Sequence, residues 1–161
     1  MAGHPFAAEV EWTVDGDFAG NAYSRQHVWR FDGGLEIAAS ASPAIVPLPY
    51  SAEAAVDPEE AFVAALSSCH MMSFLHVARQ ANINVAGYRD AARGELNRVA
   101  KGRMAITKVV LRPDITLVAE KDPDPVLLAG LHEKAHEICF IANSVSCEVV
   151  VEPGPLRLVA P

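Results

Sequence analysis

The chain lacks the clusters of lysine and arginine that nucleic-acid-binding proteins present to phosphate groups. It has 161 residues, of which 13 are basic and 20 are acidic, for a formal net charge of −7. An acidic chain without a basic patch is not expected to bind nucleic acid. It also shows no apolar run near the roughly 20 residues that span a bilayer, and no N-terminal signal peptide. The sequence therefore predicts a cytoplasmic protein with neither a nucleic-acid nor a membrane partner.

Cysteine is also scarce, with three residues in the whole chain. Proteins without a secretion signal rarely contain structural disulfides, so three cysteines argue against a disulfide framework. A catalytic disulfide that forms and breaks during a reaction is still compatible with this composition. The length is typical of one domain with a real core, and we expect residues 1–161 to form a single domain.

The N-terminal third predicts three short strands. Apolar residues alternate over residues 10–14, which is typical of a half-buried strand. Residues 23–31 and 35–39 predict the next two strands, and Asp32-Gly33-Gly34 between them is a strong hairpin signal. Residues 40–55 hold three prolines and predict a long loop, and such loops are often functional.

A helix is predicted to begin after Asp57. This residue is suited to the N-cap, Pro58 to the first helical position, and Glu60 follows three residues after the cap. Apolar residues then recur at helical spacing to about Ala81. Small residues near the middle of the helix would allow a second helix to approach closely, namely Ala64, Ala65, Ser67 and Ser68.

The C-terminal half predicts two long strands, a helix and a last strand. The strands cover residues 85–99 and 104–118, the helix lies within 122–143, and the last strand covers 145–151. Pro153-Gly154-Pro155 is expected to end the ordered fold. The order β-β-β-α-β-β-α-β indicates an α+β protein with an antiparallel sheet packed on the first helix.

Two cysteines carry the strongest chemical signal. Cys69 and Cys139 are 70 residues apart, each on a predicted helix and each near a histidine in sequence. The thiolate is the reactive form of cysteine, and Cys69 is too far from the helix start to use its dipole. It therefore needs a cationic neighbour, and the candidates are Arg25, Arg30, His70 and His136. The simpler interpretation is that Cys69 and Cys139 are small buried apolar residues, as Cys147 is expected to be.

A metal site is the alternative that the residues leave open. Its ligands would be Cys69, His70, His136 and Cys139. His136 and Cys139 share a helix face, but Cys69 and His70 are adjacent and point about 100° apart. Zinc sites more often use spacings such as C-x-x-C or H-x₃-H. The remaining histidines, namely His4, His27, His76 and His132, predict no constellation.

The sequence resembles the OsmC/Ohr family, which comprises osmotically inducible protein C and the organic hydroperoxide resistance proteins. The resemblance covers nearly the whole chain and rests on two segments. They are Asp57-Pro58-Glu59-Glu60 … Ser68-Cys69-His70 and Ala135-His136-Glu137-Ile138-Cys139 … Asn143. In one respect the chain departs from the hydroperoxide resistance branch, because Phe140 stands where that branch has proline. It therefore looks like an OsmC-like branch.

The resemblance implies a thiol peroxidase that reduces organic hydroperoxides. Cys69 matches the family's peroxidatic cysteine and Cys139 the resolving one, and Glu59 matches the family's glutamate. Arg25 matches the family's arginine, with Arg30 as a rival. The resemblance further implies an intertwined homodimer whose sheets wrap central helices, an external dithiol as reductant, and no metal or flavin cofactor.

Two other functions stay open at this point. One is a zinc- or redox-sensing protein that uses the same Cys and His residues without turnover. The other is a carrier of hydrophobic ligands, suggested by the proline-rich loop and the 51% apolar composition.

Overall fold

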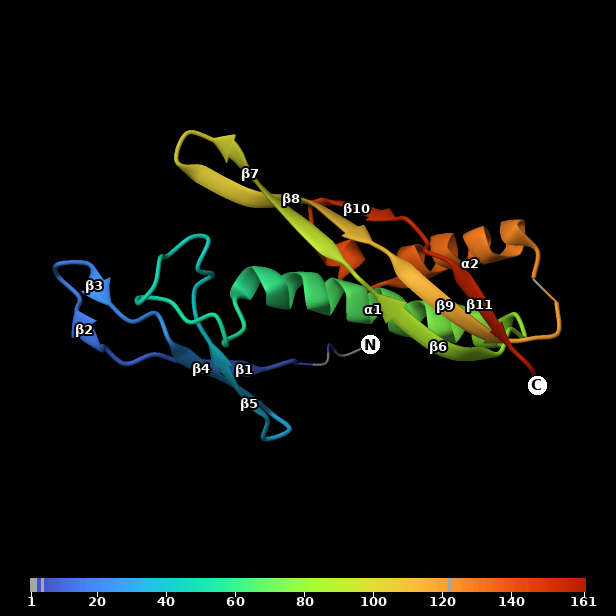
Figure 1. Ribbon diagram of the computed structural model, residues 1–161, viewed down its shortest axis with the longest axis horizontal. Coiled ribbons are helices and arrows are strands. Elements are labelled where there is room, and N and C mark those ends of the chain that lie inside the picture. Colours follow the sequence, from blue (N-terminus) through green and yellow to red (C-terminus); the bar gives the residue numbers. More distant parts are fainter. Residues whose placement is uncertain (1–2, 4, 122) are drawn as a thin grey trace. The chain divides into compact units, whose positions relative to one another are not determined.

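The computed structural model describes residue 3, residues 5–121 and residues 123–161. Strands β1–β5 precede helix α1, strands β6–β9 precede helix α2, and a short 3₁₀ turn, η1, leads into β10 and β11 (Figure 1). The predicted α+β class is confirmed. Backbone packing divides the chain into two compact units, Met1–Ala61 and Phe62–Pro161. That residues 1–161 act as one domain stays a prediction.

The first unit contains a three-stranded antiparallel sheet in the order β1-β4-β5 and a two-stranded ribbon, β2-β3. The strands are β1 (Ala8–Glu11), β2 (Gly16–Asp17), β3 (Ala22–Tyr23), β4 (His27–Phe31) and β5 (Glu36–Ala39). The predicted hairpin at Asp32-Gly33-Gly34 is confirmed as the β4–β5 turn. Gly34 has a φ of 81°, which favours glycine, and its N–H donates to the carbonyl of Phe31.

The prediction of one strand over residues 23–31 is wrong. The chain leaves the ladder between β3 and β4, because the backbone N–H groups of Ser24 and Arg25 donate to the carbonyls of Asp15 and Tyr50. These partners lie in other segments, so the alternation of the sequence does not reveal the break. Arg25 therefore lies in the irregular segment between β3 and β4 rather than in a strand.

Helix α1 (Pro58–Gln80) begins where the capping pattern predicts. Asp57 Oδ1 accepts a hydrogen bond of 2.7 Å from the backbone N–H of Glu60, which satisfies one of the free donors at the helix start. The helix then runs for 23 residues. The position of Cys69 near its middle is thus confirmed.

Helix α1 is also long and apolar enough, by length and composition alone, to cross a membrane. The expectation that no apolar run comes near bilayer length is therefore wrong for this helix. Six of its residues are buried: Leu66, Cys69, His70, Phe74, Val77 and Ala78. The central helix of a soluble domain has the same length and composition, so this property carries little weight.

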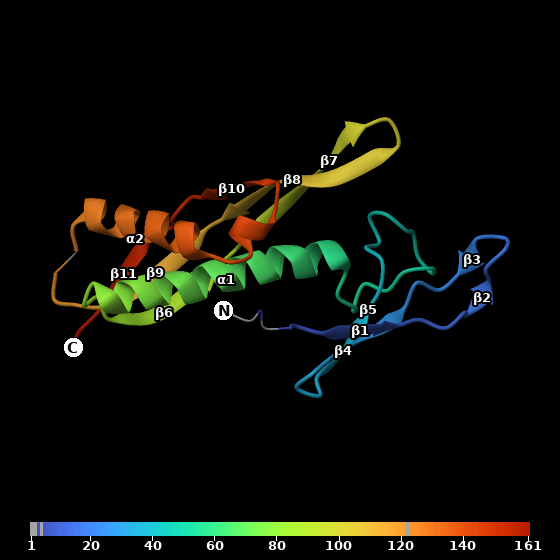
Figure 2. The ribbon, with the colours of Figure 1, turned by 180° about the vertical axis from the view of Figure 1, so that it is seen from behind.

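The second unit holds two three-stranded sheets. One has the order β10-β8-β7 and the other β11-β9-β6, and the pairs β10–β8 and β11–β9 are parallel. The strands are β6 (Val85–Asp90), β7 (Arg93–Ala100), β8 (Arg103–Leu111), β9 (Pro113–Val118), β10 (Glu148–Val151) and β11 (Leu156–Val159). Helices α1 and α2 (Pro125–Ile138) cover the same side of these strands (Figures 1 and 2).

The two long strands predicted over residues 85–99 and 104–118 are each split in two. β6 pairs with β9 and β7 with β8, so both strands of the hairpin pass from one sheet to the other at the same level. Asp90 stabilises this corner, because its carboxylate accepts hydrogen bonds from the backbone N–H of Arg112 and the hydroxyl of Ser67. Pro113 follows Arg112 at this corner, and because proline has no backbone N–H it cannot donate a hydrogen bond to a neighbouring strand.

Helix α2 lies within the predicted range 122–143, whose first residue is outside the described residues, and Asp124 caps it, because its Oδ1 accepts from the N–H of Val126. Two boundaries after α2 differ from prediction. The last predicted strand begins later than expected, as β10 at Glu148. Pro153-Gly154-Pro155 does not end the fold. The N–H of Gly154 donates to the carbonyl of Pro113, and the chain continues as β11 beside β9.

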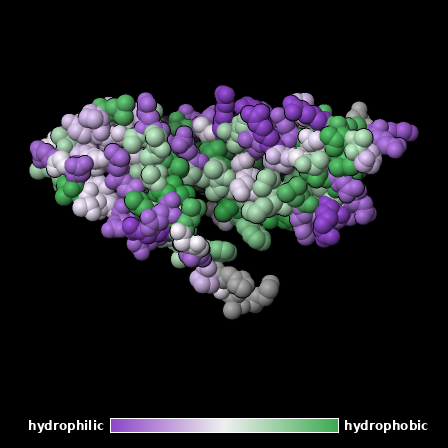
Figure 3. Space-filling model, turned by 60° about the horizontal axis from the view of Figure 1, so that its bottom comes forward, coloured by the Kyte–Doolittle hydropathy of each residue, from purple (hydrophilic) through white to green (hydrophobic). Residues whose placement is uncertain are grey.

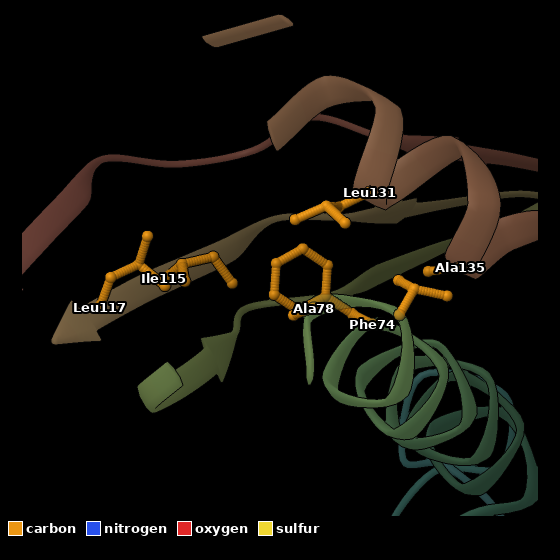
Figure 4. Packing of buried hydrophobic residues seen from close by; sticks show 7 residues of the cluster. Phe74, Ala78, Ile115, Leu117, Leu131 and Ala135 are labelled. Carbon is orange, nitrogen blue, oxygen red and sulfur yellow. The ribbon is translucent and has the colours of Figure 1, made fainter. Parts of the chain in front are cut away.

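Two apolar clusters form the core of the second unit. The first joins α1, α2 and β9 around Phe74 and includes Ala78, Ile115, Leu117, Leu131 and Ala135 (Figure 4). Full burial of a side chain such as Phe74 contributes about 1.5–3 kcal/mol. The second cluster, here called the sulfur cluster, contains Leu66, Cys69, Val109, Leu111 and Cys139.

Candidate functional site

The fold brings Cys69 and Cys139 together in the sulfur cluster. Cys69 comes from α1 and Cys139 from the residue after α2, and both side chains are buried in this one cluster. Cys139 is fully buried and Cys69 is 9% exposed. Both are free thiols. The pair therefore has the proximity that a reversible disulfide requires.

Backbone N–H groups point at both sulfur atoms. Ile141 N donates to Cys69 Sγ at 3.5 Å, and Ala142 N donates to Cys139 Sγ at 3.4 Å. Donors aimed at sulfur favour the thiolate form. For Cys139, however, burial and the hydrogen bond with Cys69 prevail and raise the pKa of its thiol to about 11. Cys139 is therefore protonated at neutral pH.

Cys139 lies at the C-cap of α2, not within the helix as predicted. Helix α2 ends at Ile138, and the backbone of Cys139 is extended. Asn143 fixes the turn that follows, because its side-chain Nδ2 donates to the carbonyl of Glu137 and its N–H to that of Cys139. The turn directs the N–H groups of residues 141 and 142 toward the two sulfurs.

Arg25 borders an aromatic cavity within the first unit. The cavity has a volume of about 350 Å³ and is lined by Trp12, Phe18, Tyr23, Arg25, His27, Ser40, Ala41 and Pro58. The guanidinium carbon of Arg25 lies 3.7 Å from the ring centre of Tyr23, a cation–π contact. Its nitrogens donate to the carbonyl of Tyr23 and the side chain of Asn21. Arg25 makes no salt bridge within the described part of the chain.

Arg30, the rival of Arg25, is bound to three glutamates. Its guanidinium contacts Glu9 at 3.1 Å and Glu36 at 2.6 Å, and also pairs with Glu11. Hydrogen bonds to Glu11 and Glu36 raise the pKa of Arg30 above its ordinary value. This side chain therefore serves the β1-β4-β5 sheet, since all three partners lie on its strands.

Glu59 lies in the first turn of α1 and is half-buried. It makes no salt bridge among the described residues. A half-buried carboxylate that has no cationic partner in its own surroundings can pair with a cation from another segment or another chain.

A buried histidine pair went unrecognised in the sequence. His70 Nε2 and His132 Nδ1 are 3.3 Å apart, the rings are stacked, and His132 also stacks on Phe74. The expectation that His132 belongs to no constellation is therefore wrong. The available signal was the i, i+3 spacing that puts His132 on the same helix face as the buried Ala135.

Burial shifts the titration of both histidines. It lowers the pKa of His70 to about 4, with smaller effects from the charges of His132 and His136. It also lowers the pKa of His132 to about 4, against an opposing effect of Asp90. Both rings are therefore neutral at pH 7.

We expect the protein to lose stability as the pH falls from about 6.5 toward 4. Folded-state pKa values near 4 mean that the unfolded chain binds protons first, so acid favours unfolding. For one such histidine the loss between pH 7.5 and pH 5 is about 2 kcal/mol. Urea unfolding of the wild type and of His132→Gln at both pH values measures it.

The variant should show a smaller difference between the two pH values than the wild type. His76→Gln is the matched control, because His76 lies on the same helix as His70 but is exposed, and it should behave like the wild type. An unfolding free energy that is equal at both pH values in the wild type would contradict the interpretation.

The structure gathers no metal site among the residues it describes. Within residues 5–121 and 123–161, no group of three or more His, Cys, Asp or Glu side chains is arranged to hold a metal ion. The set Cys69, His70, His136 and Cys139 is therefore not assembled there. His4, another histidine considered, lies outside the described residues.

Comparisons with known proteins point to one family. Residues 51–153 match the family model described as OsmC-like protein. An OsmC-like protein of unknown function from Vibrio cholerae is 50% identical, with a TM-score of 0.89, covering 94% of this chain and 99% of its own. A search of curated proteins gives no match.

Two more distant structures share the fold. An organic hydroperoxide resistance protein from Elizabethkingia anophelis is 18% identical, with a TM-score of 0.64 and 99% coverage of both chains. The organic hydroperoxide resistance protein OhrB of Bacillus subtilis is 22% identical, with a TM-score of 0.57, covering 96% of this chain and 98% of its own.

Proposed function

Because this chain belongs to the OsmC family, which includes organic hydroperoxide resistance proteins, we propose that it is a thiol-dependent peroxidase acting on organic hydroperoxides. The observation that carries the proposal is the contact between Cys69 and Cys139 in one buried cluster. A pair of free thiols, one of them slightly exposed, can be oxidised to a disulfide and so give up two electrons.

The reaction starts at Cys69. Its thiolate attacks the terminal oxygen of the hydroperoxide, the O–O bond breaks, and the alkoxide takes a proton and leaves as the alcohol. Cys69 is then a sulfenic acid. Cys139 condenses with it to form a disulfide and water, and an external dithiol restores both thiols by exchange.

Arg25 is the better candidate for the cation that supports Cys69. It borders a cavity and makes no salt bridge among the described residues, whereas Arg30 is held by three carboxylates. In the proposed reaction Arg25 stabilises the thiolate and polarises the peroxide, and Glu59 orients Arg25.

The active form proposed here is a homodimer. Helix α1 exposes Ala65, Ser68, Met72 and Leu75, which recur every three or four residues and thus share a face. All eight residues of β7 are exposed, and the β7–β8 hairpin exposes Leu96, Val99 and Met104. Apolar side chains are visible on the surface in Figure 3. A second copy of the chain would cover such surfaces. We place this enzyme in the cytoplasm.

We expect organic hydroperoxides to be reduced at least tenfold more efficiently than hydrogen peroxide. Leu66 belongs to the sulfur cluster, Phe62 and Ile141 pack against it, and the cavity beside Arg25 is aromatic. A tenfold preference corresponds to about 1.4 kcal/mol, which burial of two methylene groups supplies.

Thiol titration tests both the function and the preference. The denatured reduced chain should show three thiols, and one equivalent of cumene hydroperoxide should leave one. The same titration with hydrogen peroxide should proceed more slowly, and kcat/KM values for the two peroxides give the ratio. Equal kcat/KM values for the two peroxides would contradict the substrate preference. No loss of thiols with either peroxide would contradict the peroxidase function.

A further inference from the structure

The third cysteine of the chain also packs against the sulfur cluster. Cys147 directly precedes β10 and contacts the cluster together with Val149 and Val151. Residues 147, 149 and 151 alternate along an extended segment and therefore face the same side. Cys147 was expected to fill the core, whereas the structure places it half-buried against the cluster that contains the other two thiols.

The segment from Cys139 to Cys147 folds back on itself. Asn143 N donates to the carbonyl of Cys139 and Ser144 N to that of Ile141, which closes the 3₁₀ turn η1 (Ala142–Ser144). The chain then enters β10, which runs parallel to β8, and Val109 and Leu111 of β8 belong to the sulfur cluster. Both cysteines at the ends of this segment thus reach the same cluster.

The three thiols differ in exposure. Cys139 is fully buried and Cys69 is 9% exposed, whereas Cys147 falls in the intermediate range. Thiol–disulfide exchange requires a thiolate to reach a sulfur atom directly. A disulfide between Cys69 and Cys139 is therefore poorly accessible to an external dithiol, and one that includes Cys147 is more accessible.

We propose that Cys147 is a relay thiol that moves the disulfide from the buried pair to a position open to the external reductant; this rests on the proposed peroxidase function. The Cys147 thiolate attacks Cys139 Sγ, the bond between Cys69 and Cys139 breaks, and Cys69 leaves as the thiolate. The number of disulfides is unchanged in this step. The external dithiol then attacks Cys147 Sγ, Cys139 leaves and takes a proton, and the second thiol of the reductant releases Cys147.

Peptide mapping tests the relay directly. Cleavage after lysine and arginine places Cys139 and Cys147 on one peptide, residues 135–157, and Cys69 on another, residues 31–79. The wild type is treated with one equivalent of cumene hydroperoxide, quenched with acid and blocked with N-ethylmaleimide. We expect part of peptide 135–157 to be 2 Da lighter than its reduced form, with Cys69 blocked by maleimide. Absence of this species, with only linked peptides found, would overturn the relay.

Steady-state kinetics with dithiothreitol give the second test. Cys147→Ser should oxidise Cys69 in a single turnover as fast as the wild type, but its sustained rate should fall at least fivefold. Cys147→Ala should do the same, and Ser146→Ala, at the exposed neighbouring position, should turn over like the wild type. A sustained rate in both Cys147 variants equal to that of the wild type overturns the proposal. A wild type that never oxidises Cys69 refutes the peroxidase itself.

Discussion

Cys69→Ser should abolish the consumption of organic hydroperoxide. A serine hydroxyl at this position is neutral at pH 7 and is a far weaker nucleophile toward peroxide than a thiolate. Because Cys69 is the oxidised residue in the proposed reaction, the substitution removes the group that attacks the peroxide. We expect the rate to fall to that of the uncatalysed reaction, measured by peroxide loss with dithiothreitol as reductant.

Cys139→Ser separates the first step of that reaction from the others. This variant should still show one rapid oxidation of Cys69, trapped as the sulfenic acid by dimedone, without the sustained turnover of the wild type. Thermal unfolding should show that both variants fold with a lower melting temperature, because each replaces a buried sulfur by a smaller and more polar oxygen. Full activity of Cys69→Ser would refute the assignment of Cys69.

Inactive chains should restore activity to each other when mixed. Helix α1 runs without interruption from Pro58 to Gln80, so the ten residues between Glu59 and Cys69 rise about 15 Å along its axis. One arginine does not easily bridge that distance within a single helix. We therefore predict an obligate dimer in which Glu59 of one chain serves Cys69 of the other.

The exposed face of α1 fits such a pairing. Ala64, Ala65 and Ser68 are exposed and small, so a second helix can approach closely there. Ser67, which the sequence analysis grouped with them, is half-buried instead, and its hydroxyl donates to the carboxylate of Asp90. The contact face is thus narrower than the sequence suggests.

The experiment mixes Cys69→Ser with Glu59→Ala chains under conditions that exchange subunits. A heterodimer with shared sites holds one site with both residues intact and one with neither. It should recover up to half of wild-type activity per dimer, while each variant alone stays inactive. A fully active monomer, or no recovery once exchange is demonstrated by mass spectrometry, would defeat the shared site.

Sequence reasoning succeeded where the structure is decided by neighbouring residues. Asp57 caps α1 through the N–H of Glu60, three residues away, and Asp32-Gly33-Gly34 turns the chain within the β4–β5 hairpin. Such contacts are local, so residue type and spacing predict them. The same holds for the placement of Cys69 on a long apolar helix.

The strand boundaries that depend on residues distant in sequence were not predicted. The corner at Asp90 depends on Arg112, and β11 depends on pairing with β9, about forty residues earlier. The alternation of apolar residues continues through the corner. For this reason the sequence predicted two long strands where the structure has the four strands β6–β9. Parallel pairing across such separations leaves no pattern in either strand by itself.

The candidate site divides in the same way. The sequence by itself determined which residue types are present, and its resemblance to the OsmC/Ohr family singled out Cys69, Cys139, Arg25 and Glu59. Only the tertiary structure decided that Cys139 is fully buried against Cys69 with a raised pKa, that Cys147 joins them, and that His70 stacks on His132. Burial and long-range contact depend on how separate segments pack, and no single segment contains that information.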